Sequence, residues 1–390
     1  MITSTTAEQR KQQTNLEPGV LYFNNASFGI WPKKTYDVVQ KKTELMSQQG
    51  FLSFDPIVCG EEVEKIFTKF SKLINCSSSA LALTNSTSDG MHLIATGLDL
   101  EKMRGKNIIL NDLEFIANSF IWQQMAKKYK MQIVTVKSNN GRLLMSDFET
   151  AINDNLGLVA ISSVQFSNGF RVNLKDLTEL THDHGGLIAV DAIQQVGALT
   201  FDTSILDIDF LTVGGYKWLC APYGTGLIYV KPELQEKLDP IAITWHGDLD
   251  PMNMTHRDFK PFKDGRKFST LGIASPSIFG LSVSLDHHLA WGPSNSEKYL
   301  FQITNYIINR FHEELEGFKL ISPRDTIAES SQILAYKANI AMDELVNYLA
   351  QRKISCGLRD GNLRLAPHVY ATRDDVDAMI VGIKDALKLS

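Results

Sequence analysis

Residues 186–230 read GLIAVDAIQQVGALTFDTSILDIDFLTVGGYKWLCAPYGTGLIYV, and two apolar runs in this stretch each lead to a charged side chain. The run Gly186–Val190 is followed by Asp191, and the run Phe210–Val213 is followed by Gly-Gly-Tyr and then Lys217. Short apolar runs bounded by glycine and polar residues are typical of buried strands in a parallel sheet. Because open α/β sheets bind ligands at the carboxyl ends of their strands, we predict that Asp191 and Lys217 lie together at that edge.

A carboxylate and a lysine at such an edge are the pair that pyridoxal 5′-phosphate (PLP) chemistry requires. The amine forms a Schiff base with the cofactor aldehyde, and the carboxylate keeps the pyridine nitrogen protonated, so that the ring accepts electrons from a carbanion. Each residue alone has a structural explanation that we favour, since strands often end in Asp and most lysines are solvated. The two together, in this spacing, point to PLP.

The strings VDAIQQVGA (190–198) and DFLTVGGYKWLCAPYGTGLIYV (209–230) resemble the class V aminotransferase family of fold-type I PLP enzymes. That family includes cysteine desulfurases, kynureninases, isopenicillin-N-epimerase-like proteins and small-substrate transaminases. Four further segments resemble family motifs in the expected order: LYFNNASFG (21–29), LTNSTSDG (83–90), EFIANSFIW (114–122) and LRLAPHVYAT (363–372). The resemblance therefore spans nearly the whole chain and implies PLP as the cofactor.

Between residues 80 and 230, apolar runs alternate with helical patterns, which predicts an α/β fold with a mostly parallel central sheet and helices on both faces. The predicted strands are Ala80–Thr84, Asn107–Leu110, Gln132–Val136, Leu158–Ser162, Leu187–Val190, Phe210–Val213 and Gly226–Val230. We expect an N-terminal arm (1–20), a large PLP-binding domain (21–270) and a smaller C-terminal α+β domain (271–390). Two of the expected C-terminal helices are Glu297–Leu315 and Arg373–Leu387.

The bulk properties are those of an ordinary globular enzyme. The chain has 390 residues, 44% of them hydrophobic and 21% charged, with a net charge of −5. This charge balance gives no indication of a basic surface that would bind nucleic acid or an anionic membrane. No apolar stretch reaches membrane-spanning length. The polar N-terminus lacks the apolar core of a signal peptide, so we expect a cytoplasmic protein. The four cysteines have neither zinc-site nor disulfide-framework spacing, and we predict no metal.

The resemblance implies a role for each residue around the cofactor ring. Lys217 is the Schiff-base lysine and, once substrate has released it, the base that moves protons at Cα. Asp191 is the partner of the pyridine nitrogen. Gln194 and Gln165 are candidates to contact the cofactor's phenolate oxygen; for Gln194, an ordinary polar turn residue is the less favoured alternative. Phe115 stands where cysteine desulfurases place a histidine over the ring; a phenyl group can stack there but cannot shuttle a proton, and a buried core residue is the alternative.

The phosphate is expected at a helix N-terminus, which presents unpaired N–H groups to an anion. Thr87 and Ser88 occupy that place, where a plain N-cap is the alternative explanation. Tyr216 supplies a hydroxyl near the phosphate, whereas many relatives also have a serine at the position of Gly214. In relatives, a threonine from the neighbouring subunit contacts the phosphate; Thr270 is the candidate here, and it implies a homodimer.

Substrate binding is assigned chiefly to Arg364, because a guanidinium matches a carboxylate in a bidentate fashion. Arg359 could bind a second substrate group or be a solvated arginine in a turn. Asn25 is a further candidate contact to the substrate carboxylate. The expected substrate is a small amino acid or keto acid.

A desulfurase of this family needs a mobile thiolate on a loop upstream of the C-terminal arginine. Cys356 lies only eight positions before Arg364, in ISCGLR, which leaves no room for such a loop. We therefore predict that the protein is not a cysteine desulfurase. The expected reaction proceeds through an external aldimine and is transamination, with a PLP-dependent lyase (C–S or kynureninase-like cleavage) or an amino-acid epimerase as the alternative.

Overall fold

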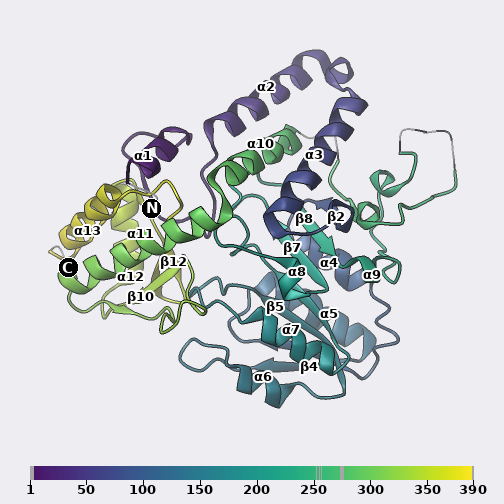
Figure 1. The fold of residues 1–390 in the computed structure, drawn as a ribbon. Coiled ribbons are helices and arrows are strands. Elements are labelled where there is room, and N and C mark those ends of the chain that lie inside the picture. Colours follow the sequence, from purple (N-terminus) through teal and green to yellow (C-terminus); the bar gives the residue numbers. More distant parts are fainter. Residues whose placement is uncertain (1–3, 252, 254, 256, 273–275, 389–390) are drawn as a thin grey trace.

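The seven predicted strands form one central sheet (Figure 1). The computed structural model describes residues 4–251, 253, 255, 257–272 and 276–388. The strand order is β2-β8-β7-β6-β5-β3-β4. The strands are β2 (Leu81–Thr84), β3 (Asn107–Asn111), β4 (Gln132–Val136), β5 (Leu156–Ser162), β6 (Leu187–Asp191), β7 (Phe210–Gly214) and β8 (Gly226–Val230).

Only one strand of this sheet runs against the others. β8 is antiparallel to both β7 and β2, whereas the β7-β6-β5-β3-β4 pairs are parallel. The segment between β7 and β8 contains no helix, and a parallel return would need a crossover of a dozen or more residues, usually helical. The same segment contains Lys217, so the reversal places the lysine in a turn at the sheet edge.

Apolar layers cover both faces of the sheet. Ile188 and Val190 of β6 belong to one buried cluster and Ala189, between them, to the other, as the alternation of side chains in a strand requires. One layer includes helices α3 (Pro56–Ile74), α7 (Leu174–Asp183) and α10 (Pro276–Trp291), and the other includes α4 (Thr87–Gly97) and α5 (Ile116–Tyr129). The predicted fold class, a mostly parallel sheet with helices on both faces, is confirmed.

The C-terminal part forms a second α+β unit, which appears with both chain ends at the left of Figure 1. Its sheet has the order β12-β13-β10-β9, with antiparallel neighbours. Its strands are β9 (Lys319–Leu320), β10 (Leu334–Lys337), β12 (Gly357–Arg359) and β13 (Asn362–Leu365), and its helices are α11 (Pro293–Glu314), α12 (Met342–Gln351) and α13 (Arg373–Leu387). The helix α13 begins with a capping box between Thr372 and Asp375, a strong start signal.

Two segments cross the boundaries predicted at residues 20/21 and 270/271. Strand β1 (Leu21–Tyr22) pairs with β11 (Ile354–Ser355), and Ala7 of α1 (Ser4–Gln12) packs in the same apolar cluster as the C-terminal helices. Conversely, α10 contributes Leu281 and Leu285 to the core beneath the large sheet. The contacts thus join residues 4–26 to the small domain and α10 to the large one.

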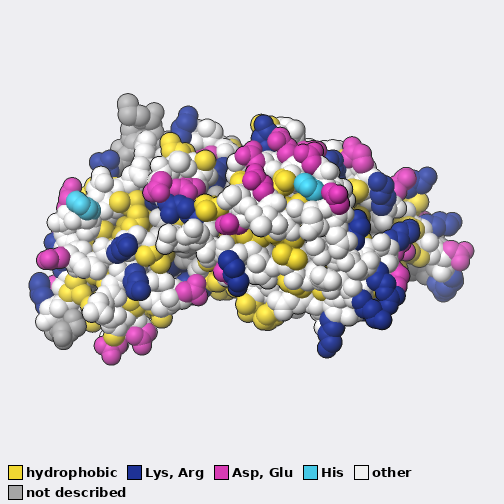
Figure 2. Space-filling model, turned by 90° about the horizontal axis from the view of Figure 1, so that it is seen from below, with side chains coloured by type: hydrophobic (Ala, Val, Ile, Leu, Met, Phe, Trp, Pro, Cys, Tyr) yellow, Lys and Arg dark blue, Asp and Glu magenta, His cyan; other side chains and the backbone are white. Residues whose placement is uncertain are grey.

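The remaining elements are peripheral to the site. They are α2 (Lys33–Gln49), α6 (Met145–Ala151), α8 (Thr203–Leu206), α9 (Pro232–Gln235) and four short 3₁₀ turns at Gly50–Ser53, Ser78–Ala80, Trp245–Gly247 and Gly265–Phe268. Within the described part of the chain, no helix is both long and apolar enough to span a bilayer. On the face shown in Figure 2, basic and acidic side chains are interspersed.

Candidate active site

Asp191 and Lys217 lie where the parallel strands end. Asp191 is the last residue of β6, and Lys217 follows the end of β7 by three positions. Both side chains are nearly buried, with 4% and 9% of their surface exposed. Burial, helped by the charge of Glu114, raises the pKa of Asp191; burial also lowers the pKa of Lys217, as do the nearby Arg364 and Arg359. A lysine with a depressed pKa is partly unprotonated near neutral pH and can act as a nucleophile or base.

Glu114 is the site residue that our sequence reasoning missed. Its buried carboxylate accepts hydrogen bonds from the Ser162 N–H (2.7 Å), the Ser162 hydroxyl, Asn111 Nδ2 (3.1 Å) and the Phe115 N–H (3.0 Å). Ser162 pairs directly with Asp191 across β5 and β6. Glu114 therefore ties the turn before α5 to the sheet edge behind Asp191. A glutamate beside an aromatic at a predicted strand end was the only signal that could have identified it.

The predicted phosphate end is built around the N-terminus of α4. Ser86 is the N-cap and accepts a hydrogen bond from the Asp89 N–H at 3.1 Å, while Thr87 and Ser88 are the first two helical residues. Thr87 Oγ1 is buried and has no hydrogen-bond partner among the described residues. Such an orphaned hydroxyl, beside the free N–H groups of a first helical turn, suits an anionic phosphate.

The absence of a side chain at Gly214 has a steric explanation. A Cβ atom there would lie 2.9 Å from the Tyr216 ring, 3.0 Å from Ile193 and 3.2 Å from Thr87 Oγ1. The ring of Tyr216 packs against Tyr223, with centroids 4.7 Å apart, and burial raises the pKa of Tyr216 to about 12. The phenol is therefore neutral at physiological pH and can donate a hydrogen bond.

The Phe115 ring lies close to Lys217, and Gln165 directly precedes Phe166, which packs on that ring. The Phe115 ring centroid is 5.7 Å from Lys217 Nζ, and Phe166 packs edge-on against the Phe115 ring at 5.2 Å. Gln165 is fully buried and its Oε1 has no partner among the described residues. An aromatic cofactor could stack on the Phe115 ring and donate a hydrogen bond to the unpaired amide oxygen of Gln165. The residues present thus fit PLP.

Two predicted contacts are already occupied by the protein itself. Gln194 donates from Nε2 to the Ala26 carbonyl (3.1 Å) and accepts at Oε1 from Trp218 Nε1 (2.8 Å). Asn25 donates to the Ala366 carbonyl (2.9 Å) and accepts from the Tyr370 hydroxyl (2.6 Å). In this arrangement, both amides serve to join segments around the site, and their roles toward cofactor and substrate stay predictions.

Arg364 and Arg359 converge on the turn after β1. Both donate to the hydroxyl of Ser27, at 2.7 and 3.0 Å. Arg364 also donates to Asn24 Oδ1 (3.3 Å) and to the Phe166 carbonyl (2.8 Å), yet its Nε remains buried without a partner among the described residues. Burial and the neighbouring Arg359 lower the pKa of Arg364 to about 9. Neither guanidinium has a carboxylate partner in the part of the chain described, which leaves this pair ready for an anion.

Thr270 lies beside the N-terminus of α4 of its own chain. Its hydroxyl donates to Asp89 Oδ2 at 2.5 Å, and its N–H bonds the Leu83 carbonyl at 2.9 Å. The predicted contact to a partner's phosphate stays a prediction.

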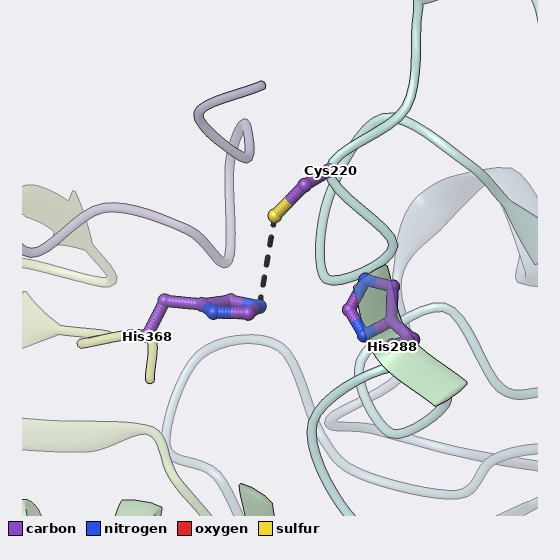
Figure 3. A group of neighbouring side chains, drawn as sticks. All are labelled: Cys220, His288 and His368. Carbon is purple, nitrogen blue, oxygen red and sulfur yellow. Dashed lines mark hydrogen bonds between the residues drawn. The ribbon is translucent and has the colours of Figure 1, made fainter. Parts of the chain in front are cut away.

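Cys220, three positions after Lys217, forms a buried group with His288 and His368 (Figure 3). The Cys220 sulfur is 3.6 Å from His368 Nε2, which also lies 3.1 Å from the Trp218 carbonyl. A carbonyl only accepts, so this nitrogen carries the proton and has no lone pair available for a metal. Burial lowers the pKa of His288 to about 4 and that of His368 to about 3. The group is neutral and anchors the lysine turn to α10 and to the segment after β13.

The chain is similar to several known proteins. An uncharacterized aminotransferase of Bacillus subtilis is 26% identical over 316 residues, covering 81% of both chains. A probable cysteine desulfurase of Pyrococcus abyssi is 26% identical over 411 residues, covering 98% of both. The crystal structure of the Escherichia coli cysteine desulfurase CsdA has the same fold, with a TM-score of 0.85 at 21% identity over 98% of both chains.

These relatives correct our functional prediction. The predicted aminotransferase activity, with its exclusion of cysteine desulfurase, is contradicted by desulfurases that match this chain over nearly its full length. The exclusion relied on the missing cysteine loop. The cysteine on that loop serves as the sulfur acceptor. Its absence does not exclude C–S cleavage, because cleavage needs only the cofactor, the lysine and some acceptor thiol.

A family model described as aminotransferase class-V matches residues 57–379. This range contains the helix α4 terminus, Glu114, Asp191, Lys217 and Arg364, whereas Asn25 and Ser27 precede it. The chain therefore belongs to the class-V aminotransferase family of PLP-dependent enzymes.

Proposed function

We propose that this protein is a cysteine desulfurase, which removes the sulfur of L-cysteine and leaves alanine. The observation that carries the proposal is the convergence of a buried amine, Lys217, with two arginines that have no acidic partner among the described residues. Such a site binds an amino acid by its carboxylate and places its Cα beside the lysine. The desulfurase names of relatives that match 98% and 83% of this chain support cysteine as that amino acid.

Each residue has a defined task in this reaction. Arg364, with Arg359 beside it, holds the α-carboxylate and so fixes the orientation of the Cα–H bond. Lys217 removes the Cα proton and later returns protons to the amino acid, because its lowered pKa lets it exchange protons near neutral pH. PLP, when bound, supplies the electron sink that labilises bonds at Cα and at the sulfur-bearing Cβ. Asp191, as a carboxylate, sustains that sink by holding the pyridine nitrogen protonated.

Burial contributes as much as the charges do. Lys217, Asp191, Glu114 and Arg364 are all less than one-tenth exposed, and exclusion of water strengthens the electrostatic interactions among them. Phe115 and Phe166 form an apolar wall beside the amine.

The test is product analysis with PLP-loaded protein, L-cysteine and excess dithiothreitol. The proposal predicts equal amounts of alanine and sulfide, and their loss in Lys217→Ala. Pyruvate with ammonia would instead identify an eliminating C–S lyase, and α-keto acid formed only with an added amino acceptor would identify transamination; either result would overturn the proposal.

We also propose that the working form is a cytoplasmic homodimer that acts on free amino acids. An exposed apolar surface supports the dimer. Phe51 and Leu52, from the connection between α2 and α3, and Ile57, at the start of α3, are 72–89% exposed. Phe51 and Trp245 help to line a mostly apolar cavity of about 460 Å³. Exposed patches of this kind mark interaction sites.

A further inference from the structure

Desulfuration needs an acceptor thiol, and the chain's own cysteines are poorly placed for that task. Cys59, Cys220 and Cys356 are buried, and Cys76 is partly buried. Burial raises the pKa of Cys76 and of Cys356 to about 12, and it raises those of Cys59 and Cys220 as well. Because the thiolate is the nucleophile, a thiol that must leave the core and lose a proton is a poor sulfur acceptor.

The cysteine nearest to the arginines in sequence is held in the core by the fold. Cys356 lies between β11 and β12, belongs to the apolar cluster of the small domain and is 7% exposed. The next two strands, β12 and β13, are joined by only Asp360 and Gly361, both with positive φ (51° and 73°). This is the backbone of a two-residue hairpin. No mobile loop exists here to carry a thiol to the site.

A cavity of about 920 Å³ is lined in part by this hairpin, through Asp360 and Asn362. Three segments that line it continue directly from site residues. Leu113 precedes Glu114 and Phe115, Ser167 and Asn168 follow Phe166, and Asp360 and Asn362 belong to the hairpin that begins with the strand of Arg359. We call this the acceptor cavity. Its volume is within the range of small-molecule sites.

The lining of the acceptor cavity selects for a polar, acidic ligand. Its lining carries amide and hydroxyl groups together with three basic side chains (Arg142, Lys319 and Arg324) and two acidic ones (Asp325 and Asp360). Lys319 is exposed and has no ion pair among the described residues. Arg359 directly precedes the lining residue Asp360 in the chain. A small molecule with carboxylates would find both hydrogen-bond donors and uncompensated positive charge.

We infer that the acceptor cavity admits a low-molecular-mass thiol bearing carboxylates, and that this thiol receives the sulfur in place of a cysteine of the chain. The inference rests on the proposed desulfurase function. In the transfer, the Cβ–S bond of cysteine breaks and an S–S bond to the acceptor thiolate forms. Cysteine plus R–S⁻ becomes alanine plus R–S–S⁻, with the thiol proton of cysteine ending on the former Cβ carbon, so no separate oxidant or reductant is required.

A single-turnover experiment separates the possibilities. PLP-loaded protein in excess over L-cysteine leaves no second cysteine molecule to act as acceptor. We expect almost no alanine until glutathione is added as the probe, followed by stoichiometric alanine and glutathione persulfide. Stoichiometric alanine without glutathione, with a gain of one sulfur mass on a cysteine-containing peptide, would overturn the inference and leave the desulfurase function standing. If no alanine formed even with glutathione, both the inference and the proposed desulfurase function would be contradicted.

A charge reversal tests the cavity itself. Lys319→Glu should raise the KM for glutathione about two- to fivefold, the effect of one exposed ion pair, without changing the KM for cysteine. The neutral thiol 2-mercaptoethanol should be unaffected by this substitution. Lys237→Glu, at an exposed lysine just after α9 in the other domain, is the matched control. Equal effects of the two substitutions on glutathione would place the acceptor elsewhere.

Discussion

At the scale of single residues, Gly214 shows how tightly the predicted phosphate end is packed. A Cβ at this position would come within 3.2 Å of Thr87 Oγ1, Ile193 and the Tyr216 ring. We predict that Gly214→Ala weakens PLP binding, since overpacking costs about 1–3 kcal/mol and the atoms displaced border the phosphate.

The measurement is a titration of cofactor-free protein with PLP. Gly60→Ala is the control, because Gly60 lies in α3 and a Cβ there meets nothing within 4 Å. Unchanged affinity in Gly214→Ala would show that the phosphate lies elsewhere.

The two arginines should differ in their effect. Arg364 is 1% exposed and holds an unpaired Nε, whereas Arg359 is only partly buried. Removal of a buried, hydrogen-bonded charge from a binding site costs about 2–5 kcal/mol. We therefore predict a loss of at least about thirtyfold in kcat/KM for cysteine in Arg364→Gln, and a smaller loss in Arg359→Gln. Steady-state alanine formation measures both; a larger loss in Arg359→Gln would reverse the assignment of the carboxylate clamp.

At the scale of elements, the buried histidines link three segments and make their junction sensitive to acid. His288 comes from α10, His368 from the segment after β13, and Cys220 from the turn after β7. Both histidines have pKa values well below their ordinary 6.5, at about 4 and about 3. Between these values and 6.5, the unfolded chain binds protons that the folded chain does not. Stability is therefore full above pH 6.5 and falls as the pH decreases.

We predict that each histidine removes about 2 kcal/mol of unfolding free energy between pH 6.5 and pH 5. Buried carboxylates with raised pKa values, such as Asp191 and Glu114, act in the opposite direction, so the comparison must be with a variant. In His368→Asn, the decrease in urea-unfolding free energy from pH 7.5 to pH 5 should be smaller than in the wild type. Parallel decreases in the two proteins would show that His368 does not titrate on unfolding.

At the scale of the whole molecule, the exposed apolar side chains between α2 and α3 bear on assembly. Phe51→Glu places a charge in the middle of this surface, and we predict that it shifts the protein from dimer to monomer. Ile327→Glu is the matched control, since Ile327 is 78% exposed in the small domain. Sedimentation velocity at several concentrations measures the shift. A wild-type protein that sediments as a monomer, or a Phe51→Glu protein that remains dimeric, contradicts the prediction.

The sequence indicated the strands and the two residues at their ends because these features depend on local order. Buried strands such as β6 and β7 are short continuous apolar runs, and the residue that follows each run lies at the sheet edge wherever the strand is placed. The positions of Asp191 and Lys217 at the sheet edge could be predicted in this way. Helices such as α13, with its capping box and apolar periodicity, were likewise evident.

Tertiary structure alone decided which distant segments meet. Arg359 and Arg364 share the hydroxyl of Ser27, more than 300 positions away, and Glu114 bonds Ser162 behind Asp191. Strand β1 pairs with β11 of the small domain. The side-chain amides of Gln194 and Asn25 donate hydrogen bonds to backbone carbonyls within the protein. The physical reason is that a polar side chain has many possible partners in the unfolded chain, and only the packing of the apolar layers brings one of them within hydrogen-bond distance.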